Sequence, residues 1–354
     1  MKILYLYAEV MGYTMATIRE LAERGNEVHV VHWDHKKLTP YKAPVVSNVF
    51  MYGRSEFSVE KIKTLAKNIA PVVTVVSGWM DRGYMSVAKQ LRQEGLPVVM
   101  GLDSHWQGTL RQWITLILGG VGFFTQFYSH VWIAGLYQFE YARRLSFDKT
   151  NIVTDLYSAD LRLFNQAYHG NIKNKYIHYP HRFLFVGRFE KVKGLDLLLK
   201  AWQQLDVIKG DWELHLIGNG SLKTQLEATT GVVVKDFMQP EQLMQEVANS
   251  GCFLLPSRGE PWGVVVHEFA AAGLPLILSD VVGAASTFLI SGLNGYSFKV
   301  DDYKALANRM CQIINMTDQE LHAMAVSSHS LSQRITPETS AVNLLSVADY
   351  KYYA

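Results

Sequence analysis

The feature that most constrains the fold is a regular alternation of short apolar runs with longer segments of helical periodicity. In the first half, the runs Lys2–Tyr7, Glu27–His32, Val45–Phe50 and Val72–Val76 are rich in β-branched and aromatic residues and are predicted as strands. Segments with the spacing of amphipathic helices separate most of these runs. Strands separated by helix-length segments predict βαβ units, and therefore a parallel sheet with helices on its faces.

The same alternation restarts after residue 181, with predicted strands that include Arg182–Val186, Glu213–Ile217 and Cys252–Leu255. Between the two series the periodicity fades into a polar, glycine-containing stretch, which is typical of a linker. A chain of 354 residues is also too long for one ordinary core. We therefore predict two Rossmann-like α/β domains with these boundaries: an N-terminal domain over 1–160, a linker over 161–181, a C-terminal domain over 182–335, and a helix over 336–354 that returns to the first domain.

Composition excludes several classes of protein. The 34 basic and 32 acidic residues give a net charge of +2, which is no footprint for nucleic-acid binding. Cys252 and Cys311 are the two cysteines, and neither lies in a cluster that predicts a metal framework. Cys252 lies in an apolar run, which favours a buried structural thiol. The apolar run at the N-terminus is shorter than a signal peptide requires. These observations predict a cytoplasmic protein with reduced cysteines.

One aromatic stretch allows more than one interpretation, because no charged residue lies between Arg111 and Glu140. Its length would permit a membrane span, but three glycines and several polar residues interrupt it. The interpretation that fits best is a core helix, a loop and a strand. An alternative is peripheral membrane contact through residues 113–128, with Trp113, Phe123 and Phe124 at the lipid surface.

The strongest chemical signal is a pair of acids, Glu260 and Glu268, placed at the junction between a predicted strand and a helix. Glu260 lies in the loop after the strand, and Glu268 lies in the helix that follows. Helix N-termini favour anions, so the backbone N–H groups near Gly263, Val264 and Val265 can receive a phosphate. A carboxylate beside a bound phosphate suits hydroxyls or a developing cation. A sugar joined to a diphosphate presents both kinds of group, although either acid alone could be a solvated surface residue.

These residues belong to a segment that resembles a known family. Residues 255–275, LPSRGEPWGVVVHEFAAAGLP, are similar to the E-x7-E region of the family-4 retaining glycosyltransferases of the GT-B fold. Upstream, residues 185–196 resemble the family's VGR…KG segment, and residues 217–221 resemble its IGdG turn. Residues 234–240 lie where the family contacts the base. The resemblance covers most of residues 182–300 strongly and residues 1–160 weakly, and it implies two Rossmann-like domains that face a central cleft.

The resemblance also implies a role for individual side chains. Arg188 and Lys193 match the two cations that hold the donor diphosphate, which suits a planar fork and a point charge. Glu268 would accept hydrogen bonds from the ribose. Glu260 would hold the transferred sugar and stabilise the oxocarbenium-like charge at C1. The remaining residues implied in donor binding are Gly12, Gly218, Asn219, Phe237, Met238, Gly263, Val264 and Val265.

The N-terminal half, which holds the acceptor in this family, carries fewer matching residues. Gly12 stands where the family has a glycine-rich turn, and the absence of a G-x-G-x-x-G pattern there argues against a nicotinamide enzyme. His105 matches a family histidine that contacts the donor sugar, and it completes the implied catalytic set with Glu260, Lys193 and Arg188. Asp103 could orient His105 or meet the acceptor. Tyr157 and Ser158 depart from the family pattern.

The implied activity is retaining transfer of a hexose-type unit from a nucleotide diphosphate sugar to a glycan or lipid-linked acceptor, in cell-surface polysaccharide synthesis. The family usually needs no metal, and we expect no cofactor beyond the donor itself. Two alternatives stay open at this point. One is a catalytically silent GT-B protein that binds a nucleotide sugar or serves as a scaffold. The other is a GT-B epimerase that acts on the nucleotide sugar without an acceptor.

Overall fold

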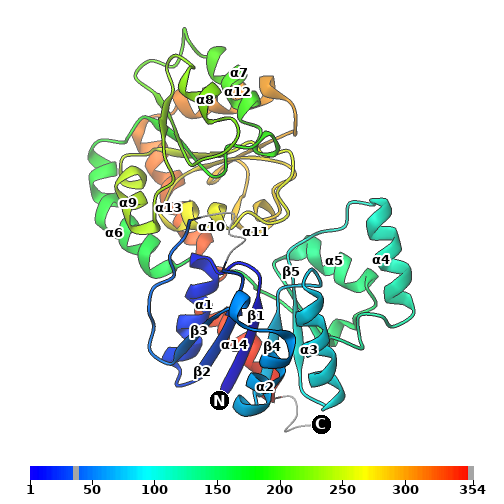
Figure 1. Cartoon of the computed structure of the whole chain (residues 1–354). Helices are drawn as coiled ribbons and strands as arrows, with labels where there is room; N and C mark the ends of the chain where they lie inside the picture. The colour runs from blue at the N-terminus through cyan, green and yellow to red at the C-terminus, as the bar shows by residue number, and fades with distance from the viewer. Residues whose placement is uncertain (35–39, 350–354) are drawn as a thin grey trace. The chain divides into compact units, whose positions relative to one another are not determined.

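The computed structural model describes residues 1–34 and 40–349 and divides into two compact units (Figure 1). Unit 1 comprises Met1–Ser158 together with the C-terminal segment from Ile335, and unit 2 comprises Ala159–Arg334. The chain therefore passes between the units twice. Each unit contains one parallel sheet with helices packed on it, so the prediction of two Rossmann-like units is confirmed.

The sheet of unit 1 has the strand order β3-β2-β1-β4-β5-β6-β7, and every described pairing in it is parallel. Its strands are β1 (Lys2–Tyr7), β2 (Glu27–His32), β3 (Val49–Gly53), β4 (Val73–Val76), β5 (Val98–Leu102), β6 (His130–Ile133) and β7 (Ile152–Val153). Its α-helices are α1 (Gly12–Glu23), α2 (Val59–Ile69), α3 (Arg82–Gln93), α4 (Leu110–Gly120), α5 (Leu136–Arg144) and α14 (Pro337–Asp349). Helix α14, red in Figure 1, packs against α1.

One predicted strand of unit 1 begins later than expected. The apolar run at Val45–Phe50 predicted a strand from Val45, but β3 begins at Val49. Val45 is fully exposed, and Asn48 has a left-handed backbone with φ 61°. A left-handed residue cannot continue an extended strand, so the chain turns at Asn48 before it pairs with β2. Apolar composition alone therefore placed the start of this strand four residues too early.

The charge-free stretch forms a helix, turns and a strand in the expected order, namely α4, residues 121–127 and β6. The alternative in which Phe123 and Phe124 lie together at a lipid surface is wrong for Phe124. Phe124 is 1% exposed within the core of unit 1, and Phe123 packs against that core. Helix α4 is instead a surface helix, with Gly119 as its buried residue. Within residues 1–34 and 40–349, no helix combines the length and the apolar content needed to cross a membrane.

The sheet of unit 2 has the order β10-β9-β8-β11-β12-β13 and is also parallel. Its strands are β8 (Arg182–Val186), β9 (Glu213–Ile217), β10 (Val233–Lys235), β11 (Cys252–Leu255), β12 (Leu276–Ser279) and β13 (Gly295–Phe298). Its α-helices are α6 (Leu161–Ile177), α7 (Leu195–Gln203), α8 (Lys223–Glu227), α9 (Pro240–Ala248), α10 (Val264–Ala271), α11 (Ala285–Phe288), α12 (Tyr303–Ile314) and α13 (Asp318–Ser332). Cys252 is fully buried in β11, and burial raises the pKa of its thiol.

The segment predicted as a linker, residues 161–181, is largely helical, and this expectation is corrected. Helix α6 occupies Leu161–Ile177 and packs against α9, α10 and α13 of unit 2. Phe164 and Tyr168 are buried on its inner face, and the buried Lys175 donates a hydrogen bond to the Ser250 carbonyl at 2.8 Å. The polar residues that suggested a linker lie between these anchors. Tertiary packing thus stabilises a helix whose local sequence signal is weak.

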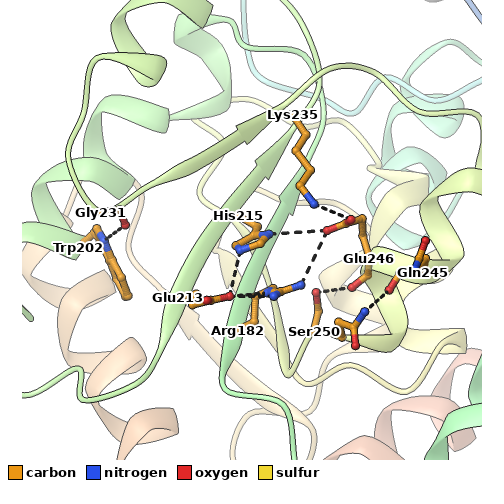
Figure 2. Close-up of polar contacts among 10 residues, drawn as sticks. Arg182, Trp202, Glu213, His215, Gly231, Lys235, Gln245, Glu246 and Ser250 are labelled. Carbon is orange, nitrogen blue, oxygen red and sulfur yellow. Dashed lines mark hydrogen bonds and ion pairs between the residues drawn. The ribbon is translucent and has the colours of Figure 1, made fainter.

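A charged network holds α9 against the sheet of unit 2 (Figure 2). Glu246 of α9 accepts from Lys235 at 2.6 Å and lies 3.8 Å from Arg182 and 3.6 Å from His215. Glu213 pairs with Arg182 at 2.8 Å and with His215 at 3.0 Å. Burial lowers the pKa of His215, and the neighbouring Arg182 lowers it further. The network fixes α9 and the end of β10, and so it fixes the loop between them.

Candidate functional site

Every predicted donor-binding residue of unit 2 follows the carboxyl end of a neighbouring parallel strand or lies in the helix after it. These loops leave β8, β9, β10 and β11 at the same edge of the sheet. The order of the strands reverses beside β8, because β9 pairs with one side of it and β11 with the other. Ligands of open α/β sheets bind at such a reversal, outside the carboxyl ends of the strands. The fold therefore gathers Arg188, Lys193, Gly218, Asn219, Phe237, Met238, Glu260 and Glu268 along one edge of unit 2.

Lys193 and Glu260 form a direct ion pair at the centre of this edge. Lys193 ends the short helix η3 (Lys191–Lys193) after β8, and its Nζ contacts Glu260 Oε2. The two side chains are only 14% and 12% exposed, and the Ser257 hydroxyl donates to the same carboxylate at 3.3 Å. A partly buried cation and carboxylate thus share one small volume. When a bond breaks heterolytically, such a pair can stabilise the negative charge on the leaving group and the positive charge on the atom that it leaves.

A glycine makes this approach possible. Gly194 has φ 68°, and a Cβ placed on it would lie 2.0 Å from the Pro256 carbonyl oxygen. The turn after η3 therefore packs directly on the chain that leaves β11, with no room for a side chain. This contact brings the backbone of Lys193 close to the loop of Glu260. The packing therefore explains why a glycine follows Lys193 in the sequence.

Arg258 ties the same loops together and was missed from the sequence. Its guanidinium donates to the Asp196 carboxylate at 2.6 and 2.8 Å, to Asp301 at 2.6 Å and to the Lys191 carbonyl at 2.8 Å. The hydrogen bonds to Asp196 are the main cause of the raised pKa of Arg258. The backbone N–H of Arg258 also donates to the Val192 carbonyl at 2.7 Å. One side chain thus fixes η3, which carries Lys193, to the loop that carries Glu260.

The glycine-containing turns after β8 and β9 are packed against each other. The Gly187 N–H donates to the Ile217 carbonyl at 3.0 Å, and a Cβ on Gly218 would lie 1.9 Å from the Gly187 carbonyl oxygen. The Asn219 carbonyl accepts from Phe189 at 2.8 Å, on the residue after Arg188. The structure therefore brings the turns of Arg188 and Gly218–Asn219 together. The Asn219 amide reaches Asp236 at 3.5 Å, which joins them to the half-buried Phe237 and Met238.

Helix α10 presents its N-terminus to this edge. Gly263, at the N-cap, has φ 89° and, as a glycine, has no side chain that could accept from the first turn. The N–H groups of the first turn, near Val264 and Val265, are the anion-binding element expected there. Glu268 lies farther along the helix. Burial raises the pKa of Glu268 to about 7, and the neighbouring Asp160 carboxylate adds to the shift.

The two predicted site residues of the N-terminal half, Gly12 and His105, belong to unit 1. Gly12 begins α1, and a Cβ on it would make an ordinary 3.9 Å contact with Tyr41, so neither strain nor space requires glycine there. His105 follows β5, with Nε2 3.3 Å from the Gln107 amide. Its Nδ1 has no hydrogen-bond partner among the described residues. Asp103 accepts a hydrogen bond from the Tyr157 hydroxyl at 3.5 Å.

Unit 1 also contains a cavity of about 300 Å³ at the carboxyl ends of β4 and β5. Ser77, Trp79 and Asp103 line it from these strand ends, and Arg111 and Gln112 line it from the start of α4. An aromatic ring, a carboxylate and a cation make this surface suitable for a saccharide with an anionic group. Of these residues, Trp79 was missed from the sequence, because it follows a strand without any motif.

Comparison with known proteins matches both the sequence of unit 2 and the fold of the whole chain. Residues 171–327 match the family "Glycosyl transferases group 1". An uncharacterised glycosyltransferase of Methanocaldococcus jannaschii is 32% identical over 52% of this chain and 54% of its own length. The capsular polysaccharide biosynthesis glycosyltransferase CapM of Staphylococcus aureus is 26% identical over 48% of this chain and 45% of its own. The chain thus spans about half the length of the curated relatives it matches.

The crystal structure of Anabaena HepE in complex with UDP-glucose superposes with a TM-score of 0.73 at 15% identity, over 100% of both chains. At that identity the likeness concerns the fold, which is GT-B as the sequence predicted. The residues that the family model matches all lie in unit 2, which holds the ion pair and α10. Residues 171–327 thus match a glycosyltransferase family, and the chain as a whole has the GT-B fold.

Proposed function

We propose that this chain transfers a sugar from a nucleotide diphosphate sugar to a glycan or lipid-linked acceptor with retention of the anomeric configuration. The observation that carries the proposal is the Lys193–Glu260 ion pair, in which Lys193 follows the turn of Arg188 and Glu260 precedes the N-terminus of α10. The edge combines groups that suit a diphosphate with carboxylates that suit hydroxyls. A nucleotide diphosphate sugar presents both kinds of group in one molecule, because its diphosphate is joined to a sugar that carries hydroxyls.

Each residue has a separate task in the proposed reaction. The bond between C1 and the diphosphate oxygen breaks, and Lys193 and Arg188 neutralise the charge that develops on the leaving diphosphate. Glu260 holds the sugar hydroxyls and stabilises the positive charge at C1. The acceptor oxygen bonds to C1 on the face that the diphosphate leaves, and its proton passes to the leaving phosphate oxygen. Glu268 accepts hydrogen bonds from the ribose hydroxyls and so fixes the nucleotide end of the donor.

The test is turnover in purified variants, with UDP-glucose first among a set of nucleotide sugars. Lys193→Ala and Glu260→Ala are expected to lose transfer by about two orders of magnitude or more while they remain folded, as circular dichroism would show. Lys63→Ala is the matched control, because Lys63 forms a similar pair with Glu60 on the surface of unit 1. Wild-type turnover in both site variants would refute the catalytic roles of Lys193 and Glu260. Donor binding without turnover would favour the silent binding protein, and conversion of the donor to an epimer without an acceptor would favour the epimerase.

In this proposal the acceptor binds in the cavity of unit 1. Trp79 offers a ring for the sugar face, Asp103 accepts from hydroxyls, and Arg111 meets an anionic group such as the phosphate of a lipid carrier. Trp79→Ala and Arg111→Ala are expected to raise the acceptor KM about tenfold or more, with the donor KM unchanged. Equal effects on both KM values would place these residues outside the acceptor site.

Helix α4 offers the lipid-facing surface for such an acceptor in place of Phe123 and Phe124. The helix borders the cavity at its start and lies on the outside of unit 1 in Figure 1. Residues 104–149 contain four basic and two acidic residues, a net charge of +2 that equals that of the whole chain and suits an anionic lipid surface. The apolar side chains of α4 and its C-cap that are at least half exposed are Leu110, Trp113, Ile114, Ile117 and Val121.

Co-sedimentation with vesicles of phosphatidylglycerol and phosphatidylcholine tests this surface. The double variant Ile114→Ser/Ile117→Ser is expected to lose most vesicle binding while it keeps its melting temperature, because both residues are exposed. Val326→Ser, at an exposed apolar residue of unit 2, is the matched control and is expected to bind as the wild type does. Equal binding by the double variant and the wild type would refute the lipid contact.

A further inference from the structure

The buried imidazole of His267 is hydrogen-bonded close to both points at which the chain passes from one unit to the other. The chain enters unit 2 at Ala159 and leaves it after Arg334. His267 Nδ1 accepts a hydrogen bond from the Ala159 backbone N–H at 3.0 Å. His267 Nε2 donates to the Ser332 carbonyl at 2.8 Å, two residues before the chain leaves. A single side chain of α10 is thus bonded to the segments that begin and end unit 2.

The two hydrogen bonds fix the charge and the tautomer of His267. Nδ1 must be unprotonated to accept from Ala159, and Nε2 must carry the proton that it donates to Ser332. The side chain is fully buried and stacks on the Phe288 ring at 4.2 Å. Burial lowers the pKa of His267 to about 4. The imidazole therefore stays neutral near pH 7, and both bonds persist through the pH range in which most enzymes work.

The hydrogen bond between Ala159 and His267 also lies next in sequence to Glu268, which is proposed to bind the donor. His267 precedes Glu268 in α10, and Ala159 precedes Asp160, whose carboxylate acts on the pKa of Glu268. The hydrogen bond from Ala159 to His267 thus ties the backbone next to Asp160 to helix α10. Any movement of α10 when a ligand binds at its N-terminus acts on Ala159 and Ser332 through one rigid ring.

We propose that His267 is a positioning residue that couples occupation of the donor site on α10 to the two segments by which the chain passes between the units. The inference rests on the proposed function for the identity of the ligand. Coupling of this kind is reciprocal. A donor that fixes α10 makes breaking of the two hydrogen bonds of His267 less favourable, and loss of these bonds weakens donor binding by the same factor.

Three variants separate this role from a purely structural one. His267→Phe keeps a ring to stack on Phe288 and loses both hydrogen bonds. His267→Asn keeps an acceptor for Ala159 and serves if the phenylalanine variant does not fold. His329→Phe is the matched control, because His329 bonds to the Ala271 carbonyl at 2.7 Å, at the other end of α10, and stacks on Tyr168 at 3.6 Å.

Hydrogen exchange of the backbone amides gives the first measurement, without any ligand. In His267→Phe the amide of Ala159 is expected to exchange at least about tenfold faster than in the wild type, and in His329→Phe it is expected to exchange at the wild-type rate. His267→Asn is expected to lie between the two. An unchanged exchange rate at Ala159 in His267→Phe, or in His267→Asn if only that variant folds, overturns the proposal.

Addition of UDP-glucose gives the second measurement. In the wild type it is expected to slow exchange both at the start of α10 and at Ala159, and in His267→Phe at the start of α10 alone. The pH at which donor binding is half-maximal is also expected to shift in His267→Phe, because the backbone next to Asp160 is no longer bonded to α10, and to stay unchanged in His329→Phe. Protection at α10 without protection at Ala159 in the wild type overturns the coupling and leaves the proposed function intact. Protection at neither place, with any nucleotide sugar tried, overturns both.

Discussion

Raising the pH from 6 to 8 is expected to strengthen donor binding through a single carboxyl group, that of Glu268. Burial and the nearby Asp160 raise the pKa of this group to about 7, so it changes its charge within this range. The ribose hydroxyls of a donor are hydrogen-bond donors, and an ionised carboxylate accepts them more strongly than a protonated one. Donor binding therefore favours the ionised form of Glu268.

The size of the effect follows from the pKa. A group with a pKa of about 7 is about one-tenth ionised at pH 6 and about nine-tenths ionised at pH 8, so the dissociation constant is expected to fall about tenfold across this range, or about 1.4 kcal/mol. At pH 7 the complex is expected to release about half a proton per donor bound. The ligand-free protein has the opposite trend. A raised pKa in the folded state stabilises the fold below pH 4.5, the ordinary value, and this contribution is lost as the pH rises through about 7.

Isothermal titration calorimetry with a nucleotide sugar measures both quantities, since repeating the titration in buffers of different ionisation enthalpy counts the protons released. Glu268→Gln is the matched variant, because the amide keeps the shape and one acceptor and cannot ionise. It is expected to bind the donor more weakly and with no change between pH 6 and 8. A wild-type affinity that is flat across this range, or a variant that keeps the pH dependence, would refute the assignment of Glu268 to the ribose.

Four further perturbations test the surroundings of the site. Arg258→Ala is expected to lower kcat about a hundredfold, because the turn of Lys193 loses its tie through Asp196, and added guanidinium is expected to restore part of the activity; a normal kcat would contradict the role of Arg258. Gly194→Ala is expected to lower the unfolding free energy by about 2 kcal/mol or more in a denaturant titration, since its Cβ would strike the Pro256 carbonyl, and an unchanged midpoint would contradict this. Glu246→Ala is expected to cost about 1–3 kcal/mol and to lower the melting temperature, because the cations around it lose their partner; a neutral effect would show that the network in Figure 2 stabilises nothing. Transfer is expected to continue in EDTA, because side-chain cations supply the charge at the diphosphate, and activity that depends on added metal would contradict this.

Most strands could be predicted because a parallel strand is buried on both faces and so appears as a continuous apolar run. Lys2–Tyr7 and Arg182–Val186 were predicted with the bounds that the structure has. Helix α6 was missed because the largely polar run at residues 169–174, which contains Gly170, follows its first two turns, and packing against α13 stabilises it. Strand β13 begins with Gly295, where a Cβ would strike the Leu276 carbonyl, and a glycine at a strand start gives no strand signal.

The separate roles of Lys193 and Glu260 could be predicted, because each residue lies in a motif that the family resemblance covers. Their direct contact could not, since it depends on Gly194 packing against Pro256 across 62 positions of sequence. Arg258 and His267 lie inside the same motif. Their partners are far away in the chain, so their roles follow from the tertiary structure alone. Phe124 was misplaced for a related reason, because charge-free aromatic sequence does not distinguish a core from a lipid-facing surface.

The most direct test of the central claim is the anomeric configuration of the product, measured by proton NMR on a reaction of the wild-type protein with an α-linked nucleotide sugar and its acceptor. An enzyme that uses Lys193 and Arg188 to support departure of the diphosphate and attack on the same face gives an α-linked product. A β-linked product would contradict the retaining mechanism and the role of Glu260 in it. Release of an epimerised donor without any glycosidic product would contradict transfer itself.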